Sequence, residues 1–572
     1  MIGIHTTRGR RTWSVAALAV VVLMLGVAAG CGGSSGDPGG SSGGSPAAPS
    51  GDQPVYRLGT VGMGYDSLNP FVGMYAQDYA AWMLMYPNLA QYTNELKPEP
   101  DFAQSWTTSA DGLTWTFKLT PGAVWTDGKP ITAGDAAFTI NTVVKLQGGA
   151  AAALSPFVPG IESATAVDDT TLEVKLGAPS AALLANLFQL PILPEHFWSQ
   201  YAAGDGAKLK TVTMDPAKET VVAAGPFTIE KLDIKGTTIF KRVDTFYGPK
   251  PLIKGYGFQL FTNADAAIQA LKTDQVDCVY QLPPTSADTV KSDANLEVQG
   301  FGGSMPQTLI VNDSANNTKH PELRDLKVRE AINLAMDRTA MIDTVYNGFA
   351  VPGGSLLLPL YVPEFMSADV PVTALDVARA NQLLDDAGYA KGSDGIRVAD
   401  GVKMEYTLLI GTMNRAIDSR VAEILTQNLA EVGIGITQKV VDNQVPLIMT
   451  QPKPYTDYDM TIIMWGLTPD PDWSTLISTS TMLGAYNLTG YSNPDYDKLW
   501  TQQTSEMDAA KRRGIIDQMS AMLVDDQVFM PVCYTQMVTS WNKKWQGVPD
   551  GGTPFGYYSY LNKTQFNALA VQ

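Results

Sequence analysis

Apolar and polar residues alternate most regularly in the segment 113–119, which reads LTWTFKL. Successive side chains of a strand point to opposite faces, so this period of two predicts a strand with one apolar face. Pro, Gly and Asp residues within 120–130 predict turns after it. The sequence Thr132-Ala133-Gly134-Asp135 has the pattern of a capping box and predicts the start of a helix. This region is therefore predicted to be strand, hairpin and helix.

A helical period dominates two later segments. Val328, Ala331, Ile332 and Ala335 fall at positions i, i+3, i+4 and i+7. This spacing predicts one amphipathic helix from about Leu326 to Thr344. In 421–432 the apolar residues again share one helical face, Gly433 ends the pattern, and 434–437 continues directly as a strand. A helix followed at once by a strand indicates an α/β fold.

Two further segments have the pattern of strands that end in loops. Residues 55–60 alternate weakly before a glycine-rich turn, and 458–465 is a run of mostly apolar residues that predicts a strand buried on both faces. The second run breaks at Gly466 into the loop 468–472. Ligands of α/β proteins bind at such strand ends, which makes both loops candidates for a binding site.

Length and composition favour a folded protein of several domains. The chain has 572 residues, of which 45% are hydrophobic, with 11 Trp, 23 Tyr and 18 Phe. That length exceeds what one hydrophobic core supports, so two or three domains are expected. The formal net charge is -17, which argues against a nucleic acid as partner.

The N-terminal 30 residues predict a leader for export. Basic residues at 8–11 precede an apolar run at 15–29, and this run is shorter than the ~20 residues that a membrane span needs. The sequence Ala28-Ala29-Gly30-Cys31 resembles a bacterial lipobox, with Ala28 in place of the usual Leu, so Cys31 is the expected lipidation site. Residues 31–52 predict a flexible Gly/Ser/Pro-rich tether. Whether export follows the general or the twin-arginine route stays open.

The remaining cysteines and histidines give no metal-binding pattern. Cys278 and Cys533 lie in apolar runs, so they are expected to be buried thiols, with a disulfide between them as the alternative. The mature chain has only two histidines, His196 and His320. No metal and no other cofactor is expected.

The sequence carries none of the common catalytic motifs. The sequence lacks a phosphate-binding loop, a His-Glu-x-x-His zinc motif and a Gly-x-Ser-x-Gly nucleophile turn. Asp470 and Asp472 could act as an acid–base pair. The alternative is that both residues cap and shape a proline-rich turn.

Several segments considered together resemble the family 5 solute-binding proteins, the dipeptide- and oligopeptide-binding class of ABC importers. The most specific similarity runs through three segments, 102–106, 111–119 and 125–135. Shorter matches follow in order along the chain, including 67–70, 225–227, 244–248, 327–333 and 490–494. The resemblance covers essentially all of 55–548.

The resemblance implies an α/β, two-lobed, periplasmic-binding-protein-like fold of type II with a third domain, closing on its ligand by a hinge. The domains expected from it are lobe I (53–88, 214–297 and 535–572), the extra domain II (89–213) and lobe III (298–534). The protein would not be an enzyme. It would act as a monomer that captures a peptide or similar solute and delivers it to the permease and ATPase subunits of an ABC transporter, from a lipid anchor on the outer face of the cell membrane.

Candidate ligand contacts are residues expected on loops at strand ends that face the cleft. They are Tyr65, Met74 and Tyr75 from lobe I, and Met305, Gln307, Asn414, Trp465, Thr468, Asp470, Tyr486 and Tyr491 from lobe III. Aromatic walls with a few polar groups are typical of small-molecule sites. For each aromatic residue, core packing is the alternative.

One departure from the family pattern bears on the ligand. Peptide-binding members carry an aspartate after a Gly-Trp pair at this strand end, where it receives the α-amino group of the peptide. Here the order is Trp465-Gly466, and Leu467 or Thr468 falls near the expected place. Sugars, opines or modified peptides therefore remain possible ligands.

Two other function classes remain open. A surface receptor or sensor component could share the same fold, because fold alone does not determine function. An exported hydrolase that depends on carboxylates is the other alternative. Turnover distinguishes these, since a binding protein returns its ligand chemically unchanged.

Overall fold

The computed structural model describes residues 53–62, 64–412, 415–442, 447–448, 455–466, 468–548, 558–559 and 561–571. The expected leader, tether and lipidation site Cys31, and the candidate ligand contact Asn414, lie outside these residues. Within the described ranges, no helix combines the length and the apolar composition that a membrane-crossing helix needs.

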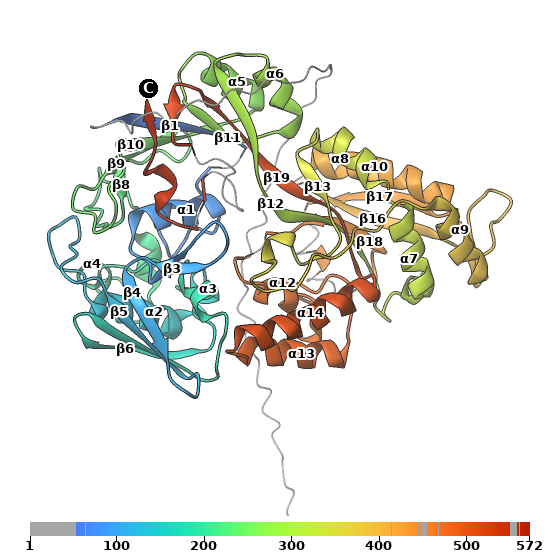
Figure 1. The fold of residues 1–572 in the computed structure, drawn as a ribbon, viewed down its shortest axis with the longest axis horizontal. Helices are drawn as coiled ribbons and strands as arrows, with labels where there is room; N and C mark the ends of the chain where they lie inside the picture. The colour runs from blue at the N-terminus through green and yellow to red at the C-terminus, as the bar shows by residue number, and fades with distance from the viewer. Residues whose placement is uncertain are drawn as a thin grey trace, which may run out of the picture.

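A large mixed sheet runs through both halves of the molecule (Figure 1). Its strand order is β17-β16-β18-β12-β19-β11-β1-β10-β9-β8, and β13 also pairs with β19. The strands are β1 (Gln53–Val61), β8 (Phe227–Lys231), β9 (Thr237–Arg242), β10 (Ile253–Phe261), β11 (Cys278–Leu282), β12 (Leu296–Val311), β13 (Ala350–Pro352), β16 (Glu405–Gly411), β17 (Gly435–Val441), β18 (Met460–Met464) and β19 (Phe529–Asn542). The long strands β12 and β19 pair with each other and belong to both halves.

The first half, called lobe I below, is built on β1, β8, β9, β10 and β11. Helices α5 (Ala264–Lys272) and α6 (Ala287–Lys291) share a buried apolar cluster with one face of this part of the sheet. The other face carries aromatic side chains, and the rings of Phe240 and Tyr256 stack at 4.4 Å. The C-terminal strand pair, β20 (Trp545–Gln546) and β21 (Ala570–Val571), also belongs to this half.

A smaller unit, called domain II below, packs against lobe I. It contains the sheet β4 (Ala103–Thr108), β5 (Thr114–Leu119), β7 (Thr171–Leu176), β6 (Ile161–Asp168), the pair β2 (Ala90–Tyr92) and β3 (Pro98–Pro100), and helices α2 (Ala133–Leu146), α3 (Leu183–Leu187) and α4 (Glu195–Trp198). The predicted strand and helix are confirmed as β5 and α2. Thr132 and Asp135 form the predicted capping box at the start of α2.

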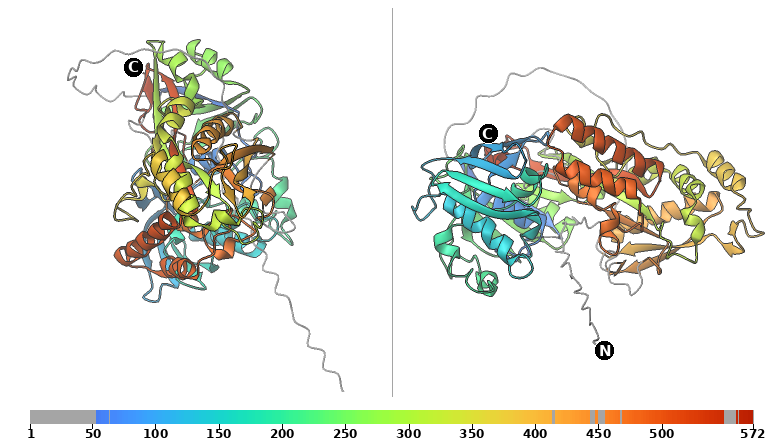
Figure 2. Two further views of the ribbon diagram at one scale, coloured as in Figure 1. Left: turned by 90° about the vertical axis from the view of Figure 1, so that its right-hand side faces the viewer. Right: turned by 90° about the horizontal axis from the view of Figure 1, so that it is seen from below.

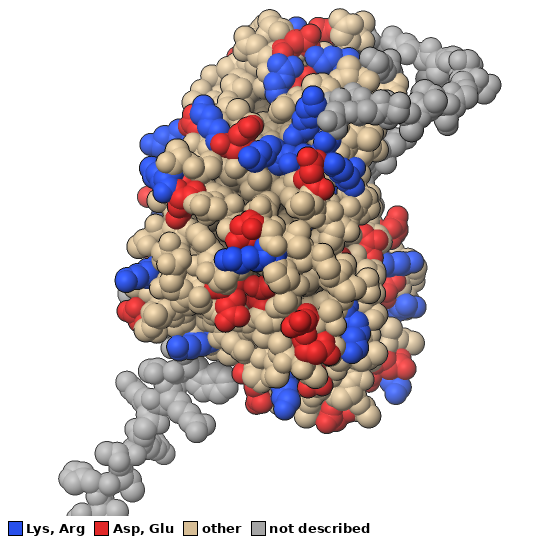
Figure 3. Space-filling model, turned by 90° about the vertical axis from the view of Figure 1, so that its left-hand side faces the viewer, with Lys and Arg blue, Asp and Glu red and all other residues tan. Residues whose placement is uncertain are grey.

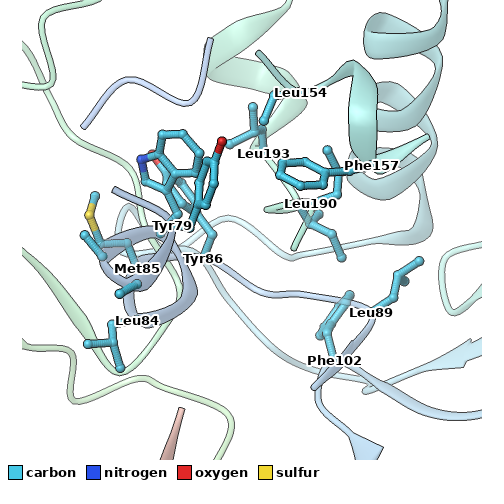
Figure 4. Close-up of a cluster of buried hydrophobic side chains, with 14 of the residues drawn as sticks. Tyr79, Leu84, Met85, Tyr86, Leu89, Phe102, Leu154, Phe157, Leu190 and Leu193 are labelled. Carbon is cyan, nitrogen blue, oxygen red and sulfur yellow. The ribbon is translucent and has the colours of Figure 1, made fainter. Parts of the chain in front are cut away.

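Helix α1 (Ala76–Met85) joins lobe I to domain II. All ten of its residues are buried, and Figure 4 shows Tyr79 lying near Phe157 of domain II. The two rings meet edge to face, with centroids 5.6 Å apart. Lobe I and domain II thus share one large apolar core.

The second half, called lobe III below, has helices on both faces of β16, β17 and β18 (Figures 1 and 2). One apolar cluster includes α7 (Leu326–Ala335), α8 (Arg338–Tyr346), α9 (Val377–Asp386) and α10 (Arg415–Glu431). A second cluster includes α12 (Asp472–Leu476), α13 (Pro494–Ser505) and α14 (Ala509–Asp525). A short hairpin, β14 (Val398–Ala399) and β15 (Val402–Lys403), is also present.

The predicted elements of lobe III are mostly confirmed, with one correction. All five residues of β18 are buried, as predicted for a strand covered on both faces. The single helix predicted over Leu326 to Thr344 is wrong, because the structure divides it into α7 and α8. Met336 adopts an extended conformation, and the Asp337 side chain accepts a hydrogen bond from the Ala340 amide, which caps a new helix. A side-chain cap thus interrupts an apolar period that continues across it.

Domain II also contacts lobe III directly. The Ala181 amide donates a 2.8 Å hydrogen bond to the Thr504 carbonyl oxygen at the end of α13. Tyr92 and Phe188 belong to the same buried cluster as Trp473 and Tyr496 of lobe III. Lobe III therefore contacts domain II at a second place, away from strands β12 and β19 that join it to lobe I.

The outer face of lobe I and domain II is viewed in Figure 3. Acidic and basic side chains are interspersed over it, among many uncharged residues. This face has no extended surface of a single charge.

Candidate functional site

The strands that join the two halves are irregular at one level. Gly302 and Gly303 of β12 have φ angles of +85° and +109°, a region that non-glycine residues rarely adopt. The β12–β19 register shifts between Gly302 and Met305. In β11 the register shifts between Val279 and Leu282, where Gln281 has a φ of +58°. The break in β12 marks where this connecting strand can bend, and the break in β11 lies in the lobe I strand that pairs with β19.

Three methionines lie beside these breaks, and all are buried: Met305 on β12, Met464 on β18 and Met537 on β19. The Thr535 hydroxyl donates to the Met305 carbonyl oxygen at 3.2 Å and lies 3.9 Å from the Met464 sulfur. From lobe I, the Nε2 atom of Gln281 lies 3.6 Å from the Met537 sulfur. Thioether side chains form an apolar surface that adapts to irregular shapes.

Gln307 is fully buried and lies next to this methionine group. It pairs with Met464 on β18 and with Cys533 on β19. Its Nε2 donates a 3.0 Å hydrogen bond to Oδ1 of Asp418, while its buried Oε1 has no hydrogen-bond partner among the residues that the structure describes. Asp418 lies in the first turn of α10. Burial raises the pKa of the Asp418 carboxyl to about 7, and the hydrogen bond from Gln307 opposes that rise.

On the lobe I side, Tyr65 lies in an aromatic group. Its hydroxyl is 2.9 Å from the Tyr558 hydroxyl, and its ring centroid is 4.5 Å from that of Phe258. Burial raises the pKa of Tyr65 well above its ordinary value, and the neighbouring Tyr558 adds to that rise. This tyrosine is therefore a neutral, packed part of the lobe I wall.

Met74 and Tyr75 are placed by a single carboxyl group. Oδ2 of Asp78 accepts hydrogen bonds from both of their amides, at 3.0 and 2.9 Å, and Oδ1 accepts one from the Asp66 amide. Both side chains are 41% exposed. Burial raises the pKa of Asp78 to about 8 despite these bonds. The two exposed side chains are thus held at the start of α1 by a buried cap.

Trp465 directly follows Met464, the last residue of β18. Its amide donates to the Pro306 carbonyl oxygen at 3.2 Å, its side chain is 1% exposed, and its buried Nε1 has no hydrogen-bond partner in the described part of the chain. Thr468 follows in the loop, where its carbonyl oxygen accepts a 2.7 Å hydrogen bond from the Tyr361 hydroxyl. The structure therefore places the Trp465 backbone beside β12, between Met305 and Gln307, while its side chain packs in the buried cluster of α12, α13 and α14.

The Asp470 carboxylate forms a buried ion pair with Arg512. Arg512 donates two hydrogen bonds to it, at 2.6 and 2.7 Å, and both side chains are buried. The neighbouring Asp472 accepts a 2.9 Å hydrogen bond from Gln503, and its burial together with the Asp470 charge raises its pKa to about 6. The two carboxyl groups therefore belong to a buried ion-pair network.

Tyr486 and Tyr491 have different surroundings. The Tyr486 ring meets Trp473 edge to face at 5.2 Å. The Tyr491 hydroxyl donates to Asp526 at 2.6 Å, and Asp526 also accepts through its carbonyl oxygen from Arg329, the ion-pair partner of Asp313. Asp313 follows the end of β12 that points away from the hinge. The structure therefore separates Tyr491 from the Gln307 group.

Sequence inspection missed Asp418, Met464, Met537 and Gln281 as members of this group. Asp418 had one usable signal, since an aspartate interrupts the apolar face of α10 in its first turn. The methionines carry no such signal, because a buried strand of this composition is also ordinary core.

The described residues include two cysteines and two histidines. Cys278 and Cys533 are both free and buried, which excludes the disulfide alternative. His196 Nε2 lies 2.8 Å from Asp127, and buried His320 lies 2.9 Å from Glu322. Among the residues that the structure describes, no group of three His, Cys, Asp or Glu side chains could hold a metal ion.

Comparison with known proteins gives a consistent result. Residues 97–527 match the family described as bacterial extracellular solute-binding proteins, family 5 middle. A putative ABC transporter peptide-binding protein of Brucella ovis is 28% identical over 437 residues, which cover 74% of this chain and 77% of that protein. The oligopeptide-binding protein AppA of Bacillus subtilis is 23% identical over 484 residues, covering 81% and 84% of the two chains.

Solved structures share the fold at low sequence identity. The substrate-binding protein CtaP of Listeria monocytogenes superposes with a TM-score of 0.75 at 22% identity, covering 91% of this chain and 99% of that one. NikA of Brucella suis, solved with Fe(III)-EDTA, gives a TM-score of 0.75 at 23% identity, covering 90% of this chain and all of that one. These similarities confirm the predicted two-lobed α/β fold.

Proposed function

Because this chain belongs to the bacterial extracellular solute-binding proteins of family 5, we propose that it captures a peptide or similar small solute between lobes I and III and delivers it to the permease of an ABC importer. The Brucella ovis and Bacillus subtilis relatives are named as peptide-binding proteins. Their names support a peptide-like ligand here. The role is binding and delivery, without chemical conversion of the solute.

The observation that carries this proposal is the break in the connecting strand β12, beside the buried methionine group. Gly302 and Gly303 allow a bend that other residues would resist. A solute that contacts both lobes only when they are closed shifts the population toward the closed form by its difference in affinity. The closed form is then the state that the permease recognises.

The proposed ligand contacts combine both lobes. Lobe III contributes Met305 and Gln307 from β12 and Trp465, Thr468 and Tyr486 from the segment after β18, and lobe I contributes Tyr65 with the exposed Met74 and Tyr75. Asp470 is proposed to act through its ion pair with Arg512, by holding the loop after β18 in place.

The membrane attachment is a separate proposal. The lipobox-like sequence before Cys31 and the Gly/Ser/Pro-rich segment after it support a lipid anchor on the outer face of the cell membrane. Cys31→Ser should leave the protein unprocessed or release it from the membrane fraction. A variant of unchanged mass that is retained in the membrane would contradict the anchor.

Binding without turnover is the direct test of the proposed function. The full chain is incubated with a mixture of tetrapeptides and examined by native mass spectrometry. We expect a complex of one protein with one peptide, and peptides released after a day with their masses unchanged. Failure to bind any peptide, or release of cleaved peptides, would contradict the proposal.

A further inference from the structure

Asp418 is a buried carboxyl group without a charged partner in the described part of the chain. Its residue is 3% exposed. Burial raises the pKa of its carboxyl group. Among the described residues, the interaction that favours the ionised form is the hydrogen bond from Gln307. Desolvation of a buried carboxylate costs free energy, and here no cation among the described residues offsets that cost. A cation supplied by a ligand would offset it.

Gln307 has an unused acceptor beside this carboxyl group. Its Nε2 already donates to Asp418 at 3.0 Å, which leaves Oε1 as a buried acceptor without a partner. Buried polar atoms are normally hydrogen-bonded, so this acceptor calls for a donor that the described residues do not supply. A carboxylate and an amide oxygen side by side accept hydrogen bonds and donate none.

Strand register places this pair at the candidate site. Parallel strands β16 and β18 are neighbours, so their carboxyl ends lie at the same edge of the sheet. Asp418 follows β16 in the first turn of α10, and Gln307 pairs with Met464, the last residue of β18. Along β19, Cys533, opposite Gln307, is four residue steps from Met537, which is roughly 13 Å. The pair is therefore at the lobe III end of the methionine group.

We propose that Asp418 and Oε1 of Gln307 bind an ammonium group of the ligand. An ammonium group is a cation with up to three N–H donors, which matches one carboxylate and one amide oxygen. The inference rests on the proposed function and narrows its ligand to solutes that carry an amine, such as peptides with a free N-terminus. Sugars and other solutes that lack a cation would leave the carboxylate unpaired.

The test compares ligands that differ only in the amine. Tetrapeptides with N-terminal alanine are compared with the same peptides in which a propionyl group replaces that alanine, which removes the amine without adding bulk. Dissociation constants are measured for the full chain by native mass spectrometry. Free-amine peptides should bind at least about thirtyfold more tightly, because a buried charge left without its partner weakens binding strongly.

Variants locate the effect at Asp418. Asp418→Asn keeps the shape and the acceptor for Gln307 but removes the charge, so free-amine peptides should bind it at least about thirtyfold more weakly. Gln307→Leu should weaken the same peptides while leaving the charge in place, and it serves as the second variant if Asp418→Asn does not fold. Asp313→Asn is the matched control, since burial also raises the pKa of Asp313, to about 6, but at the far end of β12 beside Arg329. Its affinity should equal that of the unmodified chain.

Each result decides one question. If the propionyl peptides bind as tightly as the free-amine peptides, or if Asp418→Asn and Gln307→Leu both bind like the unmodified chain, the ammonium site is wrong while the solute-binding role stands. If the unmodified chain binds neither set of peptides, the proposed peptide-binding function fails and the ammonium site fails with it.

Discussion

Two buried carboxyl groups of lobe III lie in contrasting surroundings. Asp470 faces α14, where Arg512 donates two hydrogen bonds to it. Asp418 lies in the first turn of α10 on the opposite face of the sheet, where its hydrogen bond comes from the uncharged amide of Gln307. Both side chains are almost fully buried, so within the described residues the difference between them is the presence of a cation.

The contrast separates a structural role from a binding role. A buried carboxylate that the chain itself pairs contributes to a fixed structure, and removing its partner is costly. A buried carboxylate that the chain leaves without a cation destabilises the ligand-free protein, and that cost is recovered only when a ligand supplies the cation. Sequence inspection had placed Asp470 among the ligand contacts and had not singled out Asp418.

The largest expected effect is on the paired side. Arg512→Met leaves Asp470 buried without its cation and should lower the free energy of unfolding by about 3–5 kcal/mol. Urea unfolding followed by circular dichroism measures this difference. Retained stability within 1 kcal/mol would mean that the ion pair is as weak as a surface pair, and the contrast with Asp418 would be lost.

The second prediction concerns pH and the unpaired side. The pKa of Asp418 is about 7 in the folded chain, against an ordinary value of 3.8. The folded state therefore binds more protons than the unfolded state between these values, and stability falls as the pH rises through this range. Neighbouring Tyr346 and Cys533 have raised pKa values and stay neutral there.

Asp418→Asn should remove this loss. At pH 8 the ligand-free variant should be more stable than the unmodified chain by up to roughly 4 kcal/mol, and at pH 4 the two should be nearly equal. Thermal unfolding at the two pH values measures the difference. A variant that is less stable than the unmodified chain at pH 8 would show that the carboxylate has a structural partner.

The third prediction tests whether the glycine pair of β12, near the Gln307–Asp418 pair, has a backbone conformation that other residues resist. Gly303→Ala forces a residue with a side chain to adopt a φ of +109° and should cost about 1–2 kcal/mol of stability. Gly514→Ala is the control, because this glycine lies within α14 with open space around it and should gain up to about 1 kcal/mol. Equal effects of the two substitutions on thermal unfolding would remove the special role of the glycine pair.

The smallest expected effect is on peptide affinity and concerns Trp465, which directly follows Met464 of the methionine group. If its ring contacts the ligand as proposed, Trp465→Phe should weaken peptide binding by roughly two- to tenfold. Trp465→Ala should instead lower stability by about 3–5 kcal/mol if the ring is core. Unchanged affinity in Trp465→Phe, together with a collapsed melting temperature in Trp465→Ala, would assign this residue to the core alone.

The fold was predictable from the sequence to a larger extent than the site was. The alternation at 113–119 and the cap at Thr132 are local signals, and the structure confirms both as β5 and α2. The division of 326–344 into two helices was not predicted, because the cap at Asp337 competes with an apolar period that runs on through it. The local sequence does not distinguish the roles of Asp470 and Asp418. Only the tertiary contacts of Arg512 and Gln307 distinguish them, and those contacts join residues 42 and 111 positions apart.

A crystal structure of the full chain with a free-amine tetrapeptide tests the central claim most directly. The account predicts the peptide between lobes I and III, its ammonium nitrogen within about 3 Å of the Asp418 carboxylate and of Gln307 Oε1, and Asp470 still paired with Arg512. A peptide whose ammonium group pairs with Asp470, or one bound elsewhere with the Asp418–Gln307 pair untouched, would contradict it.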